Sequence, residues 1–395
     1  MLLPEKLKRI KEVVYKILDI DISSESVVIE EAKEANELPN EYLERFTLYP
    51  LQNKETLKGR ENSLLSLERA FENWKILKTP VLVVTQPGEG ATSLLHASTY
   101  IYPSAKILET NEAIDSYQNL VSLLQKYLQV EGEFKTLNDL KKEVNANCEN
   151  EVIIIEDIER LFIRKINGFN LLEDFLLFLH GTKKNIFWVL SINKYSFYYL
   201  NRVKYFSSNF SYIINLNPID NDLLREEITS RNAGYTTIFL KPGDISKKVE
   251  KKLKGISKEE RQQLLEELFY KKLYNFSKGN ISKAILYAKR SAYKVKEKVV
   301  YIKPYTSQAI EDLNLSDLFT LEAIFQHRAL TIQELNIVLR NTNRTSRLTI
   351  EKLLEKDLIQ IVENSKKTTT EYKINLMFLE TLKDKLRSSL NRNIK

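Results

Sequence analysis

The sequence predicts an α/β fold in which a parallel sheet is covered by helices on both faces. Short apolar runs alternate with stretches of helical periodicity over the first half of the chain. Such runs are typical of strands buried inside a parallel sheet, and the alternation is typical of layered α/β proteins. The β signals stop after Pro218, where a helical stretch begins. With 395 residues, the chain is long enough for two to four domains.

Five strands follow from this alternation. A helix is expected over 60–74, where apolar residues recur every three or four positions. The expected strands are Val81–Val84, Ala105–Leu108, Val152–Ile155, Ile186–Ile192 and Tyr212–Leu216. The helices between them are expected from Thr92, near 113–129, over 136–146 and up to Leu179.

Changes in pattern divide the chain into four predicted segments. Residues 1–50 carry an N-terminal helix, Pro4 to Leu18, and an acid-rich stretch, and residues 51–218 form the α/β core. Residues 219–303 are expected to form an all-α lid, and residues 304–395 a C-terminal winged-helix domain.

The winged-helix prediction rests on the order of elements near the end of the chain. Three helices followed by a two-stranded ribbon is the pattern of a winged helix. The helices are expected at 315–325, 331–339 and 345–356, and the strands at 358–362 and 369–374.

Composition indicates an ordinary folded protein, with 43% hydrophobic and 29% charged residues. No apolar run approaches the roughly 18 residues that span a bilayer, so no membrane span is expected. The first residues lack the pattern of a signal peptide. One cysteine, Cys148, cannot form an intrachain disulfide, which favours a cytoplasmic location, and three scattered histidines argue against a zinc site.

The segment from Thr85 to Ser93 has the layout of a phosphate-binding P-loop, between an apolar strand and a helix. Such a loop binds phosphate because backbone N–H groups and a helix N-terminus point at its oxygens. Against the pattern G-x-x-x-x-G-K-[ST], Ala91 stands at the lysine position and Thr92 at the hydroxyl position. The lost lysine contact is worth about 1.5–3 kcal/mol. The candidate nucleotide-binding residues are Gln86, Pro87, Gly88, Glu89, Gly90, Ala91, Thr92 and Ser93, and a plain tight turn is the alternative.

Paired acids, Glu156 and Asp157, follow the third strand. This is a Walker B pattern, in which one acid orders Mg²⁺ and the other positions water. The usual order is Asp then Glu, and the reversal changes the reach of each carboxylate by one methylene. A misplacement of about 1 Å in a catalytic group costs about 100-fold. Asn193 ends the fourth strand and has two interpretations: a sensor of the γ-phosphate, or an N-cap of the next helix.

These elements, in this order over roughly residues 58–300, resemble the AAA+ ATPases of the initiator (Orc/Cdc6-like) and STAND-like branch. The block Glu159 to Arg164, with the strand that begins at Ile186, resembles a bacterial type with a C-terminal winged helix. The resemblance implies ATP or ADP with Mg²⁺ as ligands. It implies Thr92 and Glu156 as metal ligands, with Glu156, Asp157 and Asn193 as catalytic residues.

The resemblance also implies an arginine from the lid and an arginine finger. The lid motif Gly-Asn-x-Arg falls on Gly279 to Ser282, so serine replaces the arginine, and the neighbouring Lys283 is the candidate to contact nucleotide. Arg202 and Arg231 are the candidates for the finger.

Three departures fall on catalytic positions: Ala91, the order of Glu156 and Asp157, and Ser282. They favour a pseudo-ATPase that serves as a nucleotide-binding or nucleotide-free scaffold or switch in a protein complex, with the winged helix as docking module. One alternative is a slow but active ATPase switch. Another is a DNA-binding protein of initiator or transposition-helper type.

The predicted partner is a protein or a second copy of the chain, with DNA as the alternative. A net charge of +7 permits nucleic acid, and the DNA surface would span residues 344–373. Lys366 and Lys367 would touch the phosphate backbone there. However, the outward side of the expected recognition helix also carries Glu351 and Glu355, so this helix is not strongly basic.

Overall fold

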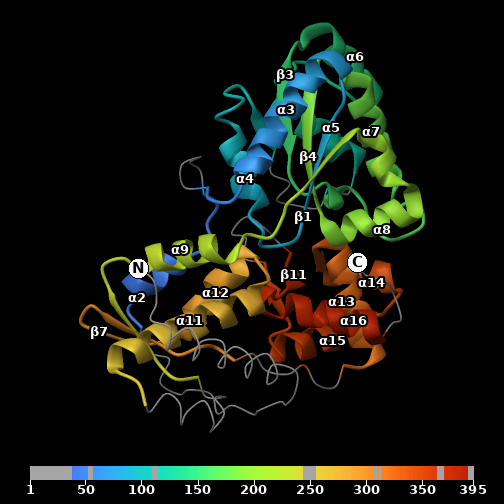
Figure 1. Ribbon diagram of the computed structural model, residues 1–395. Helices are drawn as coiled ribbons and strands as arrows, with labels where there is room; N and C mark the ends of the chain where they lie inside the picture. The colour runs from blue at the N-terminus through green and yellow to red at the C-terminus, as the bar shows by residue number, and fades with distance from the viewer. Residues whose placement is uncertain are drawn as a thin grey trace. The chain divides into compact units, whose positions relative to one another are not determined.

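The computed structural model describes residues 38–51, 57–108, 114, 116–242, 255–306, 310, 313–362 and 369–389 (Figure 1). Contacts divide the chain into two compact units. The first unit contains residues 1–49 and 218–311, and the second contains residues 50–217 and 312–395. The α/β core and the C-terminal segment therefore belong to the same unit. The helix predicted over Pro4 to Leu18 lies outside the described residues.

A five-stranded parallel sheet forms the centre of the second unit. Its order is β2-β3-β4-β1-β5, so β1 lies between β4 and β5. All pairings in this sheet are parallel, which confirms the predicted parallel α/β core. The strands are β1 (Val81–Thr85), β2 (Lys106–Leu108), β3 (Glu151–Ile155), β4 (Ile186–Asn193) and β5 (Tyr212–Asn215).

Helices cover both faces of this sheet (Figure 1). Side chains alternate along β1, so Val81 and Val83 pack with α3 and α4, while Leu82 and Val84 pack with α5, α6, α7 and α8. The helical elements are α3 (Glu61–Leu77), α4 (Ala91–Ser98), α5 (Tyr117–Leu128), α6 (Leu137–Asn147), the 3-10 helix η4 (Ile158–Leu161), α7 (Asn170–Thr182), α8 (Lys194–Lys204) and the 3-10 helix η5 (Phe206–Asn209).

We call residues 313–362 and 369–389 the C-terminal module. Its three predicted helices are present, and its sheet has three antiparallel strands in the order β10-β11-β9 rather than the predicted two. The missed strand, β9, has three residues, too few for an alternating pattern to stand out. The elements are α13 (Leu315–His327), β9 (Ala329–Thr331), α14 (Ile332–Leu339), α15 (Asn343–Glu355), β10 (Ile359–Ile361), β11 (Glu371–Ile374), the 3-10 helix η6 (Leu376–Phe378) and α16 (Leu379–Ser389).

The first unit is mainly helical but also contains a small sheet, in the order β6-β8-β7. The prediction of an all-α segment missed this sheet because its strands are short and half exposed, and because β7 alternates with lysines. The elements are α2 (Asn40–Leu43), the 3-10 helix η2 (Glu44–Phe46), α9 (Asn221–Arg231), β6 (Thr236–Phe239), α11 (Lys258–Ser277), α12 (Ile281–Ser291), β7 (Ala292–Lys296) and β8 (Val299–Ile302). Within the described ranges, no helix is both long and apolar enough to cross a bilayer.

Gly279 lies between α11 and α12 and is closely surrounded by other atoms. Its φ is +81°, and a Cβ on it would collide with Pro218 and lie 2.7 Å from the carbonyl oxygen of Ile219. Gly234 has a similar φ of +83° but open space around it. The two positions therefore separate backbone strain from steric collision.

We predict that Gly279→Ala lowers the free energy of unfolding by about 2–4 kcal/mol, the sum of a left-handed backbone and a collision. Gly234→Ala carries only the backbone strain, about 1–2 kcal/mol. Urea denaturation followed by circular dichroism measures both. Equal losses in the two variants would show that the collision is relieved without cost.

Candidate functional site

The predicted P-loop connects β1 to α4. Gly88 and Gly90 have φ of 86° and 85°, in the left-handed region that glycine adopts without strain. Gly90 directly precedes Ala91, the first residue of α4, and no described side chain caps this helix. The backbone therefore has the strand, glycine turn and helix N-terminus of a phosphate cradle.

A carboxylate of the protein itself is packed against this loop. Glu89 is buried, and its Oε2 accepts a hydrogen bond from the backbone N–H of Gln86 at 2.7 Å. The Thr85 hydroxyl lies 3.5 Å from the same oxygen. Burial raises the pKa of Glu89, while the Gln86 N–H and the charge of Arg60 oppose that rise. The loop N–H of Gln86 thus donates to an internal carboxylate, where a nucleotide-binding loop donates to a phosphate.

Arg60, just before α3, holds the P-loop through hydrogen bonds of its guanidinium. Its guanidinium donates to the backbone carbonyl of Glu89 at 2.8 Å and to that of Asn217 at 2.5 Å. Only 2% of Arg60 is exposed, and burial lowers its pKa. One buried cation therefore ties the P-loop to the segment that leaves β5.

Thr92 and Glu156 meet as the sequence predicts for a metal site. The Thr92 hydroxyl donates to Oε2 of Glu156 at 2.9 Å. Oxygen atoms of this kind are the ligands that Mg²⁺ prefers. Among the described residues, however, no three His, Cys, Asp or Glu side chains gather closely enough to hold a metal ion.

Asp157 faces a guanidinium from the C-terminal module. Its backbone is left-handed, with φ 58°, and its N–H donates to the Ser191 hydroxyl at 3.1 Å. Its carboxylate forms an ion pair with Arg328, which follows α13. The same guanidinium lies 4.0 Å from Oε1 of Glu159. The second Walker B acid is therefore neutralised by a side chain that belongs to the protein.

Glu159 is a second carboxyl group at this edge, and it is 1% exposed. Its other oxygen accepts a hydrogen bond from the Asn193 N–H at 3.2 Å. Burial raises the pKa of Glu159 to about 7. This side chain links the end of β4 to Arg328 through its two oxygens.

The side chain of Asn193 is engaged at both ends. Its oxygen accepts the Tyr195 N–H at 3.1 Å, so the helix-cap interpretation is realised at the start of α8. Its amide donates to the Phe325 carbonyl at 3.1 Å. Asn193 therefore holds the C-terminal module, and its role as a sensor stays a prediction.

Further polar contacts attach the same module to the core. Arg160 and Glu371 form a bidentate ion pair with N···O distances of 3.2–3.3 Å, and both side chains are largely buried. At the loop itself, the Gln86 amide donates to Glu380 of α16 at 2.6 Å. The module thus contacts both the P-loop and the Walker B edge of the core.

Of three other predicted residues, Lys283 and Arg231 belong to the first unit and Arg202 to the second. Lys283, in the first unit, has its amine 4.9 Å from the centre of the Phe276 ring, and its contact with nucleotide stays a prediction. Arg231, in the same unit, forms an ion pair with Glu227 and donates to the Arg45 carbonyl. Arg202 is exposed on α8. The guanidinium of Arg231 therefore makes these contacts within the first unit.

Taken together, the residues present fit a Mg²⁺–polyphosphate poorly. Thr92 and Glu156 suit a metal ion, but the loop has Ala91 in place of lysine and holds the carboxylate of Glu89. A second carboxylate, Glu380, contacts the loop from α16. Like charges in a site of low dielectric repel strongly, so this surface disfavours a polyanion.

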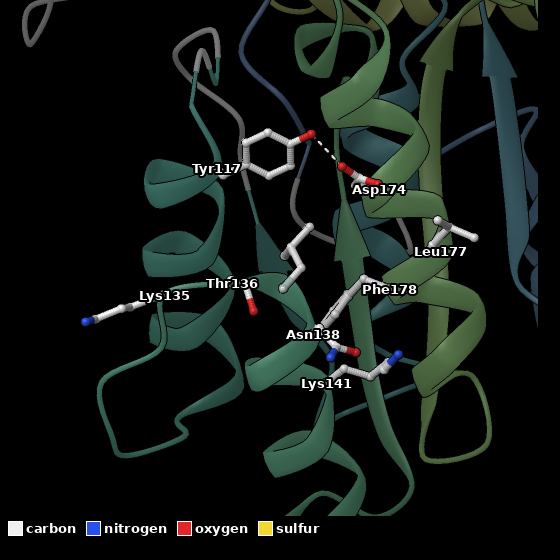
Figure 2. Close-up of a pocket in the computed structure, with 9 residues that line it drawn as sticks. Tyr117, Lys135, Thr136, Asn138, Lys141, Asp174, Leu177 and Phe178 are labelled. Atoms are coloured by element: carbon white, nitrogen blue, oxygen red, sulfur yellow. Dashed lines mark hydrogen bonds between the residues drawn. The ribbon is translucent and has the colours of Figure 1, made fainter.

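A separate pocket lies among α5, α6 and α7 (Figure 2). Its volume is about 350 Å³, and the Tyr117 hydroxyl donates to Asp174 across its upper end. Lys135, Lys141, Leu177 and Phe178 are among the residues that line it. None of the predicted site residues lines this pocket, and its one acid is already hydrogen-bonded.

Sequence reasoning missed Arg328 and Glu380 as site residues. They lie far along the chain from the P-loop, in elements whose local pattern signals only a helix and its end. Arg60 had no signal beyond the start of an expected helix. Glu159 had a local signal, a third acid two residues after Asp157.

No family model and no curated protein matches the chain. It is similar to the solved structure of Cdc6p from Pyrobaculum aerophilum, with 16% identity, a TM-score of 0.39, and coverage of 88% of this chain and 98% of that one. It is also similar to Orc1 from Aeropyrum pernix, solved in complex with DNA, with 13% identity, a TM-score of 0.43, and coverage of 85% and 94%. A Walker-type ATPase from Pyrococcus abyssi has 16% identity, a TM-score of 0.37, and coverage of 86% and 99%. These likenesses are distant, and the fold class rests on the strand order and loop of this chain.

His327 lies next to Arg328 and is buried without a hydrogen bond on either ring nitrogen. Its ring packs 4.8 Å from that of Phe162, centre to centre. Burial, aided by the charge of Arg164, lowers the pKa of His327 from 6.5 to about 3. The pKa of Glu159 is shifted the other way, from 4.5 to about 7.

We predict opposite pH dependences for two variants of this edge. The unfolded chain protonates His327 near pH 6.5 and the folded chain only near pH 3, so its contribution to stability is lost as pH falls through this window. Glu159 contributes stability that is lost as pH rises from 4.5 to 7. Each contributes up to about 1.4 kcal/mol per pH unit.

Glu159→Gln is therefore expected to lose stability between pH 7 and pH 5 more steeply than the native chain, because His327 acts alone. His327→Leu is expected to gain stability over the same range relative to the native chain. Urea midpoints at the two pH values provide the measurement. Parallel pH profiles for all three proteins would rule out a titrating pair at this edge.

Proposed function

We propose that this protein is a degenerate AAA+-like ATPase whose P-loop core serves as a nucleotide-independent scaffold in a protein complex. The observation that carries the proposal is the ion pair between Arg328 and Asp157. A guanidinium at a Walker B acid supplies the positive charge that a metal ion brings in an active site. The pair also attaches the C-terminal module to the edge where nucleotide chemistry would occur.

The charge around the loop supports the same conclusion. In phosphoryl transfer, catalysis depends on positioning and on cations matched to developing negative charge. Here Ala91 supplies no cation, Glu89 adds a buried carboxylate, and Gln86 is hydrogen-bonded to Glu380. Each feature disfavours the transition state, and together they favour binding and assembly over turnover.

One observation favours a second candidate, a slow ATPase switch. Thr92 and Glu156 retain the hydroxyl–carboxylate pair that orders Mg²⁺ beside a nucleotide. Turnover by this route requires Asp157 to leave Arg328, so the C-terminal module would separate from the core in the active state. The two candidate functions therefore predict different states of Arg328: separated from Asp157 in the slow switch, and paired with it in the scaffold.

We propose that the C-terminal module is a winged helix that docks protein. Its three helices and antiparallel sheet support that fold. On the exposed side of α15, two arginines are matched by Glu351 and Glu355, whereas a DNA-binding surface is predominantly basic. Part of the alternative DNA surface, residues 363–368 with Lys366 and Lys367, lies outside the described residues.

We predict that the native protein shows no phosphate release and no binding of Mg-ATP by calorimetry at ligand concentrations up to about 1 mM. The variant combining Ala91→Lys with Arg328→Ala restores the lysine and removes the competing cation. We expect it to bind Mg-ATP at least about tenfold more tightly than the native chain, one restored charge-assisted contact being worth roughly 1.5–3 kcal/mol.

Ala91→Lys combined with Arg340→Ala is the matched control, because Arg340 is an exposed arginine of the same module. It keeps the Asp157–Arg328 pair and should bind less tightly than the first combination. Native phosphate release that Glu156→Gln abolishes would overturn the scaffold proposal and establish the slow switch. Tight native binding without turnover would make the nucleotide a structural ligand and also exclude a nucleotide-free scaffold.

A further inference from the structure

Helix α15 has two sharply different sides. Ser346, Thr349, Ile350 and Leu353 are buried in the C-terminal module. On the opposite side, five side chains are exposed within about 100° of arc at 3.6 residues per turn. They are Arg344, Arg347, Leu348, Glu351 and Glu355, which we call the α15 face.

The α15 face has an apolar centre. Leu348 is 58% exposed, the one large aliphatic side chain on this face. The surface around it is shallow and open, and is bounded by Asn343, Arg347 and Glu351 among others. An exposed leucine on an open surface is suited to contact a similar side chain from a partner.

The charges on the α15 face change sign from its N-terminal to its C-terminal end. The two arginines lie toward the N-terminus, Leu348 lies between, and Glu351 and Glu355 lie toward the C-terminus. Lys352 does not disturb this order, because its amine forms an ion pair with the buried carboxylate of Asp317 in α13. The face is therefore neutral in sum but divided into a positive and a negative half.

Such a face is complementary to itself when reversed. In an antiparallel pair of helices, the arginines of one copy face the glutamates of the other, and the two Leu348 side chains lie near the centre. A two-fold axis requires this pattern, because an isologous interface brings the same surface of both subunits together. Arg344 would oppose Glu355 of the second copy, and Arg347 would oppose Glu351.

We propose that the α15 face is a dimer interface, on which a second copy of this chain docks with its α15 antiparallel. The proposal goes beyond the scaffold function and does not depend on whether the P-loop binds nucleotide. DNA is the disfavoured occupant, because Glu351 and Glu355 would meet phosphates of like charge. A pair of 13-residue helices buries less than the roughly 800 Å² per partner of a standard interface, so the dimer is weak and concentration-dependent.

The test is a charge swap on the full-length protein, followed by sedimentation equilibrium at several protein concentrations. We expect the native chain to dimerise in the micromolar range. Arg347→Glu alone and Glu351→Arg alone each place like charges opposite one another twice, so each variant should weaken self-association at least about tenfold. A 1:1 mixture of the two variants brings opposite charges together again and should recover the native association.

Controls separate this interface from unfolding and from other surfaces. Arg387→Glu makes the same charge change at an exposed position of α16 and should leave the dimer intact. Leu348→Ala should weaken association without changing the far-ultraviolet circular dichroism. Recovery in the mixture requires both variants to be folded, so it also answers the concern that a swap disrupts the module.

Three outcomes overturn the proposal. The native protein remaining monomeric at every concentration removes the dimer. A dimer that survives both single swaps, or a mixture that does not recover, assigns self-association to another surface. Salt-dependent binding of duplex DNA that Arg347→Glu abolishes, with no self-association, makes the α15 face a nucleic-acid surface instead.

Discussion

The ion pair between Arg328 and Asp157 is the contact on which the second unit depends. It lies where the carboxyl ends of parallel strands converge, the edge at which α/β proteins place ligands. A free aspartate at this edge, in a setting of low dielectric, requires a positive partner. In this protein the partner comes from the C-terminal module, so neutralising the acid and attaching the module are one event. The neighbouring contacts of Asn193 and Arg160 then fix its orientation.

The P-loop, like the Asp157 edge, is held by contacts with other side chains of the protein. Active phosphate-binding loops leave their N–H groups for the ligand. Here the backbone N–H of Gln86 donates to the carboxylate of Glu89, and its side-chain amide donates to Glu380. Arg60 completes the arrangement from the other side of the loop. The loop is therefore held by three side chains of the protein itself, Arg60, Glu89 and Glu380.

Local patterns predicted much of this fold because local physics decides it. Buried parallel strands are apolar on both faces, so the central strands β1, β3 and β4 each left a short apolar run in the sequence. Gly88 and Gly90 of the P-loop have the left-handed backbone that glycine adopts without strain. The order of the acids and the loss of lysine were visible directly at Ala91 and Glu156.

What the sequence did not predict depends on distant contacts. Nothing near Arg328 indicates that it meets Asp157, because that pairing exists only once α13 packs against α8. Asn193 had two interpretations because a cap and a sensor occupy the same place at the end of a strand. The contact with Tyr195 shows the cap, and the sensor role stays a prediction. The small sheet of β6, β7 and β8 was missed because half-exposed strands carry weak periodicity.

The second unit is interrupted in the chain by the first, and this order has a consequence for biosynthesis. The ribosome completes Asp157 long before Arg328, and residues 218–311 of the first unit are made in between. During that interval the acidic edge of the core is uncovered and unneutralised. Closing so long a loop adds little to the equilibrium cost, because loop entropy grows only logarithmically with length. It does delay the pairing of Asp157 with Arg328. A nascent chain halted before α13 would therefore expose an acidic edge that the finished protein covers. Chaperones or other partners would be able to contact this edge before the C-terminal module does.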